Sequence, residues 1–199
     1  MFMQVISGAV ADPEGLRRQF DRWASELRGG AAGWLGSTEG LTDDGRFVAC
    51  VRFESAEAAR ANSERPEQGV WWADTGKALA GPAHFHDSNT VDVYLGGGAD
   101  TAGFVQVIQG GPVDRDRLRQ IEQGFEGIAR QYRPDIMGWV MAWHQDDRFT
   151  EVVYFTSEAA AREGETKEPP EDRKHLLDDW RRVAGQLTFF DLRHPWLRS

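Results

Sequence analysis

The stretch GRFVACVRFESAEAAR at residues 45–60 returns in altered form as DRFTEVVYFTSEAAAR at residues 147–162, 102 positions further along the chain. The same offset aligns MQVISGAV at 3–10 with VQVIQGGP at 105–112. A fixed offset between similar segments is the sequence signature of a repeated structural unit. The sequence therefore predicts that the chain is a tandem duplication.

The offset changes slightly outside these segments. Gly33-Trp34 aligns with Gly138-Trp139 at an offset of 105, which we interpret as a shorter hairpin loop in the second copy. Near the end of each copy, AHFHD at 83–87 aligns with LTFFD at 187–191 at an offset of 104. The alignment thus extends over nearly all of the 199 residues.

The glycine-rich segment GGGADTAG at 96–103 separates the two copies and has the composition of a linker. We therefore expect a first unit at 1–95 and a second unit at 104–199. The run VDVYL at 91–95 lies outside the repeated pattern, and we interpret it as a further edge or bridging strand.

Each copy has the pattern β-α-β-β-α-β. Asp12 is a favourable N-cap for the first helix, and Pro13 suits its first position. The second copy has a matching helix that begins near Asp114, and both helices carry apolar residues at the spacing of one helical face. These apolar stripes are Leu16, Phe20, Trp23 and Leu27 in the first copy, and Leu118, Ile121, Phe125, Ile128 and Tyr132 in the second. A hairpin, a second helix interrupted by proline and a last strand complete each copy.

This order of elements is the ferredoxin-like arrangement of the α+β class. In this order, and in the pattern RFESAEAARANSERPEQGVWW at 52–72, the chain resembles the antibiotic biosynthesis monooxygenase-like members of the dimeric α+β barrel superfamily. The resemblance implies that two fused ferredoxin-like units form a pseudo-dimeric α+β barrel. One chain then supplies both halves of what is usually a homodimer, so a monomer and a homodimer are equally open.

The composition excludes several classes of partner. A net charge of −9 disfavours nucleic acid and anionic membranes, so we predict neither as a partner. No apolar run reaches the roughly 18 residues of a membrane span, and the first residues lack the pattern of a signal peptide. Cys50 is the only cysteine, which fits a reducing compartment. We therefore expect a cytoplasmic protein.

His84 and His86 form the first candidate group. Residues two apart on a strand point to one face, so both imidazoles can enter one cavity and act as general acid or base. Their counterparts in the second copy are Thr188 and Phe190, so the fold itself does not require histidine there. Zinc or iron needs a third ligand, and no spaced carboxylate suggests one, so we predict no metal. The plainer interpretation is a pair of surface histidines.

A second candidate group lies on the interrupted helix of the first copy, at Asn62, Arg65, Trp71 and Trp72. In the family that the chain resembles, this helix borders the substrate cavity, and members that oxidise polycyclic phenols without metal or flavin use an Asn and a Trp there. By that resemblance Asn62 is a catalytic candidate that hydrogen-bonds an oxyanion, and the two tryptophans stack on a flat ring. The plainer interpretation is one tryptophan in the core and one on its rim.

A third group, Trp143, His144 and His175, lies in the second copy. At the offset of 105, His144 replaces Glu39, and it is a substrate-binding candidate together with Trp143. Haem-binding relatives of the fold place an axial histidine on a helix, so His175 is a candidate haem ligand. Haem-degrading relatives carry Asn on the first strand, whereas this chain has Gln106 there. That departure weakens the haem alternative.

The leading prediction from the resemblance is a cofactor-independent monooxygenase-like enzyme that acts on an aromatic or polyketide-like small molecule. Two alternatives stay open. One is a non-catalytic protein of the same fold that binds a small ligand, and the other is a haem- or metal-binding member. The sequence itself does not identify the substrate.

Overall fold

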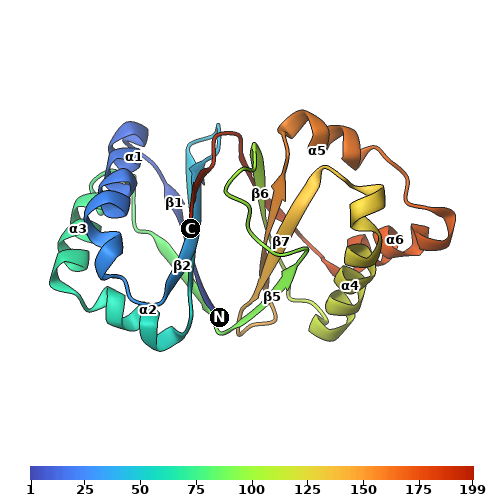
Figure 1. Ribbon diagram of the computed structural model, residues 1–199, viewed down its shortest axis with the longest axis horizontal. Coiled ribbons are helices and arrows are strands. Elements are labelled where there is room, and N and C mark those ends of the chain that lie inside the picture. The colour runs from blue at the N-terminus through green and yellow to red at the C-terminus, as the bar shows by residue number, and fades with distance from the viewer. The chain divides into compact units, whose positions relative to one another are not determined.

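The computed structural model describes all residues, 1–199, and the chain divides into two compact units (Figure 1). Unit 1 consists of Met1–Thr90 and Trp196–Ser199, and unit 2 of Val91–Pro195. Each unit is a five-stranded sheet with helices packed on one face. The predicted α+β class with two fused ferredoxin-like units is confirmed.

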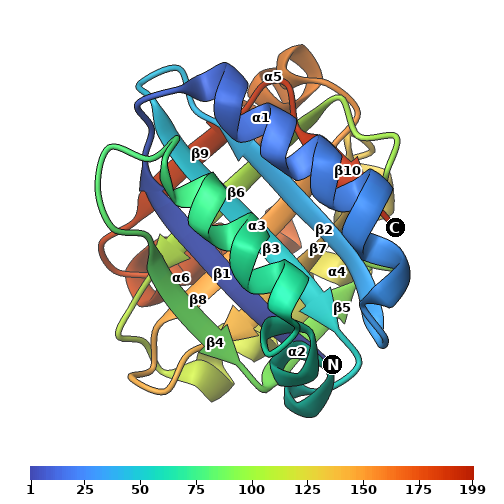
Figure 2. The same ribbon diagram turned by 90° about the vertical axis from the view of Figure 1, so that its left-hand side faces the viewer.

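Unit 1 contains three helices and the strand order β10-β2-β3-β1-β4. Figure 2 shows these helices lying over the sheet. A π-helical segment, Trp23–Leu27, and a 3-10 turn, Arg28–Gly30, continue the first helix. The elements are β1 (Phe2–Ala9), α1 (Pro13–Arg22), β2 (Trp34–Leu41), β3 (Arg46–Phe53), α2 (Ala56–Ser63), α3 (Pro66–Gly76), β4 (His84–Ser88) and β10 (Trp196–Arg198).

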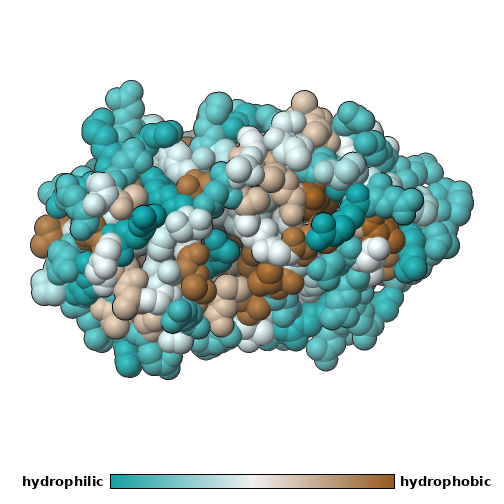
Figure 3. Space-filling model, viewed as in Figure 1, coloured by the Kyte–Doolittle hydropathy of each residue, from teal (hydrophilic) through white to brown (hydrophobic).

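Unit 2 repeats this plan with the strand order β5-β7-β8-β6-β9. A short 3-10 turn, Glu171–Arg173, precedes its last helix. The elements are β5 (Thr90–Tyr94), β6 (Phe104–Gly110), α4 (Arg115–Tyr132), β7 (Ile136–Trp143), β8 (Phe149–Phe155), α5 (Glu158–Glu165), α6 (Lys174–Val183) and β9 (Thr188–Leu192). In the view of Figure 3, the part of the surface that carries α4–α6 is mostly hydrophilic, so the apolar side of these helices faces the sheet.

The boundaries of the two units differ from those predicted from the sequence, because two short strands join the sheet of the other repeat. β5 is the edge strand of the second sheet, although its residues precede the glycine-rich segment that we predicted as the linker. The C-terminal strand β10 returns to the first sheet, where Trp196 lies opposite Glu39 of β2. Each sheet therefore takes its fifth strand from outside its own repeat. The interpretation of 91–95 as an edge strand is confirmed.

Strand pairing fixes how the two copies correspond. Trp34 lies opposite Phe53 in unit 1, and Ile136 lies opposite Phe155 in unit 2, with an irregularity at the same place in both hairpins. Trp34 therefore corresponds to Ile136, at an offset of 102. The predicted match of Trp34 with Trp139, and with it the shorter loop, is wrong. Pairing to the neighbouring strand sets the register, and the repeated Gly-Trp dipeptide is a coincidence.

The first helix of each copy begins in the same way. The carboxylates of Asp12 and Asp114 accept hydrogen bonds from the backbone N–H groups of Gly15 and Arg117, at 2.8 and 3.0 Å. This satisfies one of the free donors at each helix start, as predicted. The two caps are 102 residues apart, so residues at this offset along α1 and α4 occupy equivalent places. None of the helices combines the length and apolar composition that crossing a membrane requires.

Candidate active site in unit 2

A cavity of about 610 Å³ lies in unit 2 between the sheet and its helices. Its walls come from strands β6–β9, from α4, α5 and α6, and from the connection between α5 and α6. Six aromatic residues line it: Phe125, Tyr132, Trp139, Phe155, Trp180 and Phe189. This volume and lining are typical of sites that bind small organic molecules.

Glu122 on α4 is one of two buried carboxyl groups in this cavity, with 2% of its surface exposed. The indole Nε1–H of Trp139 donates to its Oε2 at 3.0 Å, and that of Trp180 donates to its Oε1 at 2.9 Å. Burial raises the pKa of Glu122, and the two indole hydrogen bonds oppose that rise because they favour the charged form. Glu122 is therefore a carboxyl group with an elevated pKa and a stabilised anion.

Glu151 on β8 is the second, with 5% of its surface exposed. Its Oε2 is buried and has no hydrogen-bond partner. Burial raises the pKa of Glu151 well above its usual range, and the negative charge of Glu122 raises it further. Two neighbouring buried carboxyl groups do not both ionise readily, so the pair favours a state with one proton.

The equivalent positions of unit 1 hold apolar residues. At the offset of 102, Glu122 corresponds to Phe20 and Glu151 to Ala49. The Phe20 ring packs against Phe47 and Trp71, with ring centroids 5.2 and 5.4 Å away. The two carboxyl groups are therefore particular to unit 2 and are not required by the shared fold.

A comparison of the copies at one fixed offset reveals both carboxyl groups in the sequence, although the candidate groups above omit them. Glu151 replaces Ala49 within the repeated stretch itself, and Glu122 interrupts the apolar stripe of its helix. A charged residue in one copy, at a position that is apolar in the other copy, is therefore the sequence feature that could have identified this site.

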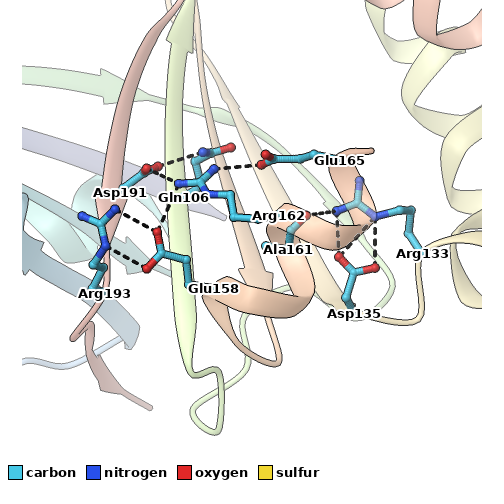
Figure 4. A network of polar contacts seen from close by, with 9 residues as sticks. All are labelled: Gln106, Arg133, Asp135, Glu158, Ala161, Arg162, Glu165, Asp191 and Arg193. Atoms are coloured by element: carbon cyan, nitrogen blue, oxygen red, sulfur yellow. Dashed lines mark hydrogen bonds and ion pairs between the residues drawn. The ribbon is translucent and has the colours of Figure 1, made fainter. Parts of the chain in front are cut away.

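A polar network borders the cavity (Figure 4). Arg162 on α5 contacts Asp191 on β9 and Glu165, while Gln106 donates its amide N–H to Asp191 at 2.8 Å. Unit 1 repeats only part of this network, since Gln4 donates to Asp87 at 3.0 Å. The Gln–Asp pair therefore belongs to the shared fold. Arg162 has a counterpart in Arg60, which pairs with Glu64 on its own helix, so only the contact of the arginine with the aspartate is particular to unit 2.

The predicted histidines lie elsewhere. His84 and His86 are exposed on the edge strand β4 of unit 1, opposite Ser7 and Val5 of β1. Phe85 between them points to the other face of the sheet, where it packs on Trp72 from the helical layer. The histidines therefore lie on the face turned away from α3, so the structure does not bring them together with the predicted tryptophans. Their catalytic role stays a prediction.

The candidates on the interrupted helix are held by contacts within unit 1. The amide oxygen of buried Asn62 accepts a hydrogen bond from Arg65 at 2.9 Å, and Arg65 also pairs with Glu67. Trp71 is in the core and donates to the backbone oxygen of Gln19 at 2.7 Å. Trp72 is half-buried on the rim, so the plainer interpretation of adjacent tryptophans describes their packing.

The third group lies in unit 2 but does not line the cavity. Trp143 is buried and donates to Asp92 at 2.6 Å, and His144 lies at the hairpin turn with its Nε2 2.9 Å from the Thr150 hydroxyl. His175 is exposed on α6. The ligand-binding roles of these residues, including a haem ligand at His175, stay predictions.

One predicted correspondence in this group is wrong. The backbone N–H of His144 bonds to the oxygen of Arg148, as that of Thr42 does to Arg46. His144 therefore corresponds to Thr42 and not to Glu39, because the hairpins have equal length.

The structure contains no group of three or more His, Cys, Asp or Glu side chains arranged to hold a metal ion. Cys50 is buried in β3, where burial raises the pKa of its thiol to about 12. Glu122 and Glu151 are thus the chemically distinctive feature of the cavity in unit 2.

Comparison with known proteins places this fold. No protein-family model and no curated protein matches the sequence. Among solved structures, the chain is similar to a candidate monooxygenase from Lactobacillus acidophilus, with a TM-score of 0.70, 10% identity and coverage of 98% of both chains. A candidate monooxygenase from Fusobacterium nucleatum gives a TM-score of 0.73 at 7% identity, over 100% of this chain and 94% of the other.

An anthrone oxidase-like protein is also similar, with a TM-score of 0.66 and 12% identity over 98% of this chain and 92% of that protein. At such identities the likeness concerns the fold. The expected resemblance is therefore confirmed at the level of the fold, over nearly the full length of the chain.

Proposed function

We propose that the protein is a cofactor-independent monooxygenase-like enzyme that oxidises a flat aromatic small molecule in the cavity of unit 2. The observation that carries this proposal is the buried pair Glu122 and Glu151, which faces a cavity lined by six aromatic rings. A passive binding site for an apolar ligand gains nothing from two buried carboxyl groups, because burying them is unfavourable. A base with a raised pKa is what removal of a proton from a weak acid requires.

The proposed reaction has a balanced form. A ring CH₂ group and one O₂ give a ring ketone and one water. A carboxylate of the pair first takes a proton from the CH₂ carbon, and the C–H electron pair passes into the ring system. The resulting carbanion is oxidised by O₂ and forms a carbon–oxygen bond to a peroxide. The peroxide anion takes the proton back from the carboxyl group. The second C–H bond and the O–O bond then break together, so one oxygen atom of O₂ becomes the ketone oxygen and the other leaves in water.

The walls of the cavity suit this substrate class. Phe125 from α4 and Trp180 from α6 provide apolar surface on the helical side, and Phe155 and Phe189 provide it on the strands. Flat ligands pack on such rings through stacked or edge contacts. The fold shared with an anthrone oxidase-like protein adds a probe, since anthrone is a flat ring ketone with an acidic CH₂ group.

The test measures oxygen uptake and formation of anthraquinone from anthrone. We expect turnover by the wild-type protein above the rate in buffer, and a loss of at least about 100-fold in Glu122→Gln, as is typical of removing a general base. Glu39→Gln is the matched control, because Glu39 is a buried carboxyl group of unit 1 outside the cavity. Binding of anthrone without oxygen uptake would favour the non-catalytic alternative and overturn the proposal.

A further inference from the structure

We propose that Glu122 and Glu151 have separate roles: Glu122 is the carboxylate that takes the proton, and Glu151 is the carboxylic acid that hydrogen-bonds an oxygen atom of the ligand. The nature of the ligand rests on the proposed function. The position of the proton within the pair is a property of the protein alone, so it can be tested without a reaction.

The contacts of Glu122 define it as the ionised partner. Both of its carboxyl oxygens accept an indole N–H, from Trp139 at 3.0 Å and from Trp180 at 2.9 Å. An indole nitrogen has a hydrogen to donate and no lone pair to accept with. A proton on either oxygen of Glu122 therefore weakens one of these hydrogen bonds. The second lone pair of each oxygen remains available for a substrate proton.

The surroundings of Glu151 favour the opposite state. Its Oε2 has no donor, and the neighbouring Glu122 carries a negative charge. The cations at the cavity are each engaged by another carboxylate: Arg133 pairs with Asp135, Arg162 with Asp191, Lys167 with Glu163, and Arg181 with Asp178. A protonated Glu151 avoids an uncompensated buried charge and keeps an O–H group to donate.

A tyrosine from the neighbouring strand does not compete for this proton. The Tyr94 ring on β5 stacks on Trp139, with centroids 5.0 Å apart. Burial raises the pKa of its hydroxyl, and the negative charges of Asp92 and Glu122 raise it further. Tyr94 therefore remains neutral over the pH range in which the carboxyl pair titrates.

These separate roles of Glu122 and Glu151 favour one kind of ligand. The end of the ligand that lies beside the two carboxyl groups is neutral and carries a ketone near an acidic C–H group. Glu122 takes the proton from carbon, and the electron pair of the broken C–H bond passes to the ketone oxygen. The O–H of Glu151 then donates to that oxyanion. A carboxylic acid kept neutral by its apolar surroundings is an effective donor of this kind. A ligand with a carboxylate at this end is excluded by the charge of Glu122.

The proton position is tested by the indole N–H resonances of Trp139 and Trp180, assigned with Trp139→Phe and Trp180→Phe, during a pH titration. We expect both resonances to move in one common step, because both groups donate to Glu122. The step persists in Glu151→Gln and disappears in Glu122→Gln. A step that disappears only in Glu151→Gln, or resonances that do not titrate while the protein stays folded, would falsify the assignment.

The donor role of Glu151 is tested with anthraquinone, a flat ring ketone without an acidic C–H group, through quenching of tryptophan fluorescence. We expect Glu151→Leu to weaken binding by about tenfold, the equivalent of one hydrogen bond. Glu151→Gln keeps a donor and should stay within about threefold of the wild-type protein. Equal affinities of the Leu and Gln variants overturn the donor role. If the pH titration and the binding series give the expected results but the protein takes up no oxygen, only the proposed reaction is contradicted, and the assigned roles of the two carboxyl groups remain.

Discussion

At the scale of single residues, the two indole groups act through Glu122 and not on the ligand itself. Trp139 and Trp180 each supply one hydrogen bond that stabilises the carboxylate. Loss of either donor makes the anion less stable, so the pKa of Glu122 rises. The proposed base works in its ionised form, and the acidic limb of its pH profile then moves to higher pH.

We predict that Trp139→Phe and Trp180→Phe each move this limb upward by about one pH unit. A hydrogen bond to a charged group contributes about 1.5–3 kcal/mol, and 1.36 kcal/mol corresponds to one pKa unit. The measurement is kcat/KM for anthrone against pH. Trp23→Phe is the control, because Trp23 of unit 1 donates its indole N–H to the neutral side chain of Gln68. If the acidic limb of the profile stays in place and only the maximal kcat/KM falls, the prediction is contradicted. The two indoles then line the cavity without affecting the pKa of Glu122.

Residue-level comparison also shows what the sequence can reveal about the site. The substitutions Ala49 to Glu151 and Phe20 to Glu122 are visible at one offset in the printed sequence. Their meeting in one cavity is not visible, because it depends on how α4 packs on β8. The prediction that His84 and His86 enter one cavity used the correct spacing along a strand. The spacing alone does not tell which face of the sheet the two side chains share, and the structure places them on the face turned away from the helices.

At the scale of elements, β10 shows how a three-residue strand is held. Its Arg198 pairs with buried Glu39 on β2, and also contacts Asp21 on α1 at 2.8 Å. Burial raises the pKa of Glu39 to about 7, while the charge of Arg198 opposes the rise. No repeat pattern in the sequence predicts this strand, because it is short and pairs with residues from the opposite end of the chain.

This pair predicts a pH dependence of stability. A carboxyl group whose pKa is raised on folding binds its proton more tightly in the folded state. Its contribution is therefore complete below the ordinary carboxyl pKa of 4.5 and is lost as pH rises through about 7. We expect the free energy of unfolding of the wild-type protein to lose about 3 kcal/mol more than that of Glu39→Gln between these limits.

Urea unfolding at a series of pH values measures this difference. Glu57→Gln is the control, because Glu57 is exposed on α2 and has a lowered pKa. Parallel curves for the wild-type protein and Glu39→Gln contradict the prediction and mean that Arg198 fully compensates the buried charge.

At the scale of the whole molecule, duplication gives two copies of one plan that differ in their buried carboxyl groups. Unit 2 has Glu122 and Glu151 in its cavity, and unit 1 has Glu39, which pairs with Arg198. The element order was predictable, because apolar periodicity and capping residues recur at a near-constant offset. The exchange of β5 and β10 was not, since it depends on pairing between distant segments. In unit 1 the ring of Phe20 occupies the place of Glu122, so its core is built for packing. Unit 2 carries two carboxyl groups at the corresponding places, where burial of a carboxyl group is unfavourable.

The double substitution Glu122→Phe with Glu151→Ala gives unit 2 the residues of unit 1, and it tests this difference directly. Replacing buried ionisable groups by apolar side chains of suitable volume often stabilises a protein by about 1–4 kcal/mol. We therefore expect a higher free energy of unfolding at pH 8, together with weaker binding of anthraquinone, because the donor at position 151 is lost and the new ring occupies part of the cavity. Urea unfolding and fluorescence quenching measure the two effects. A variant that is less stable and still binds anthraquinone would contradict the prediction. The carboxyl groups would then stabilise the fold of unit 2 and would not be needed for binding.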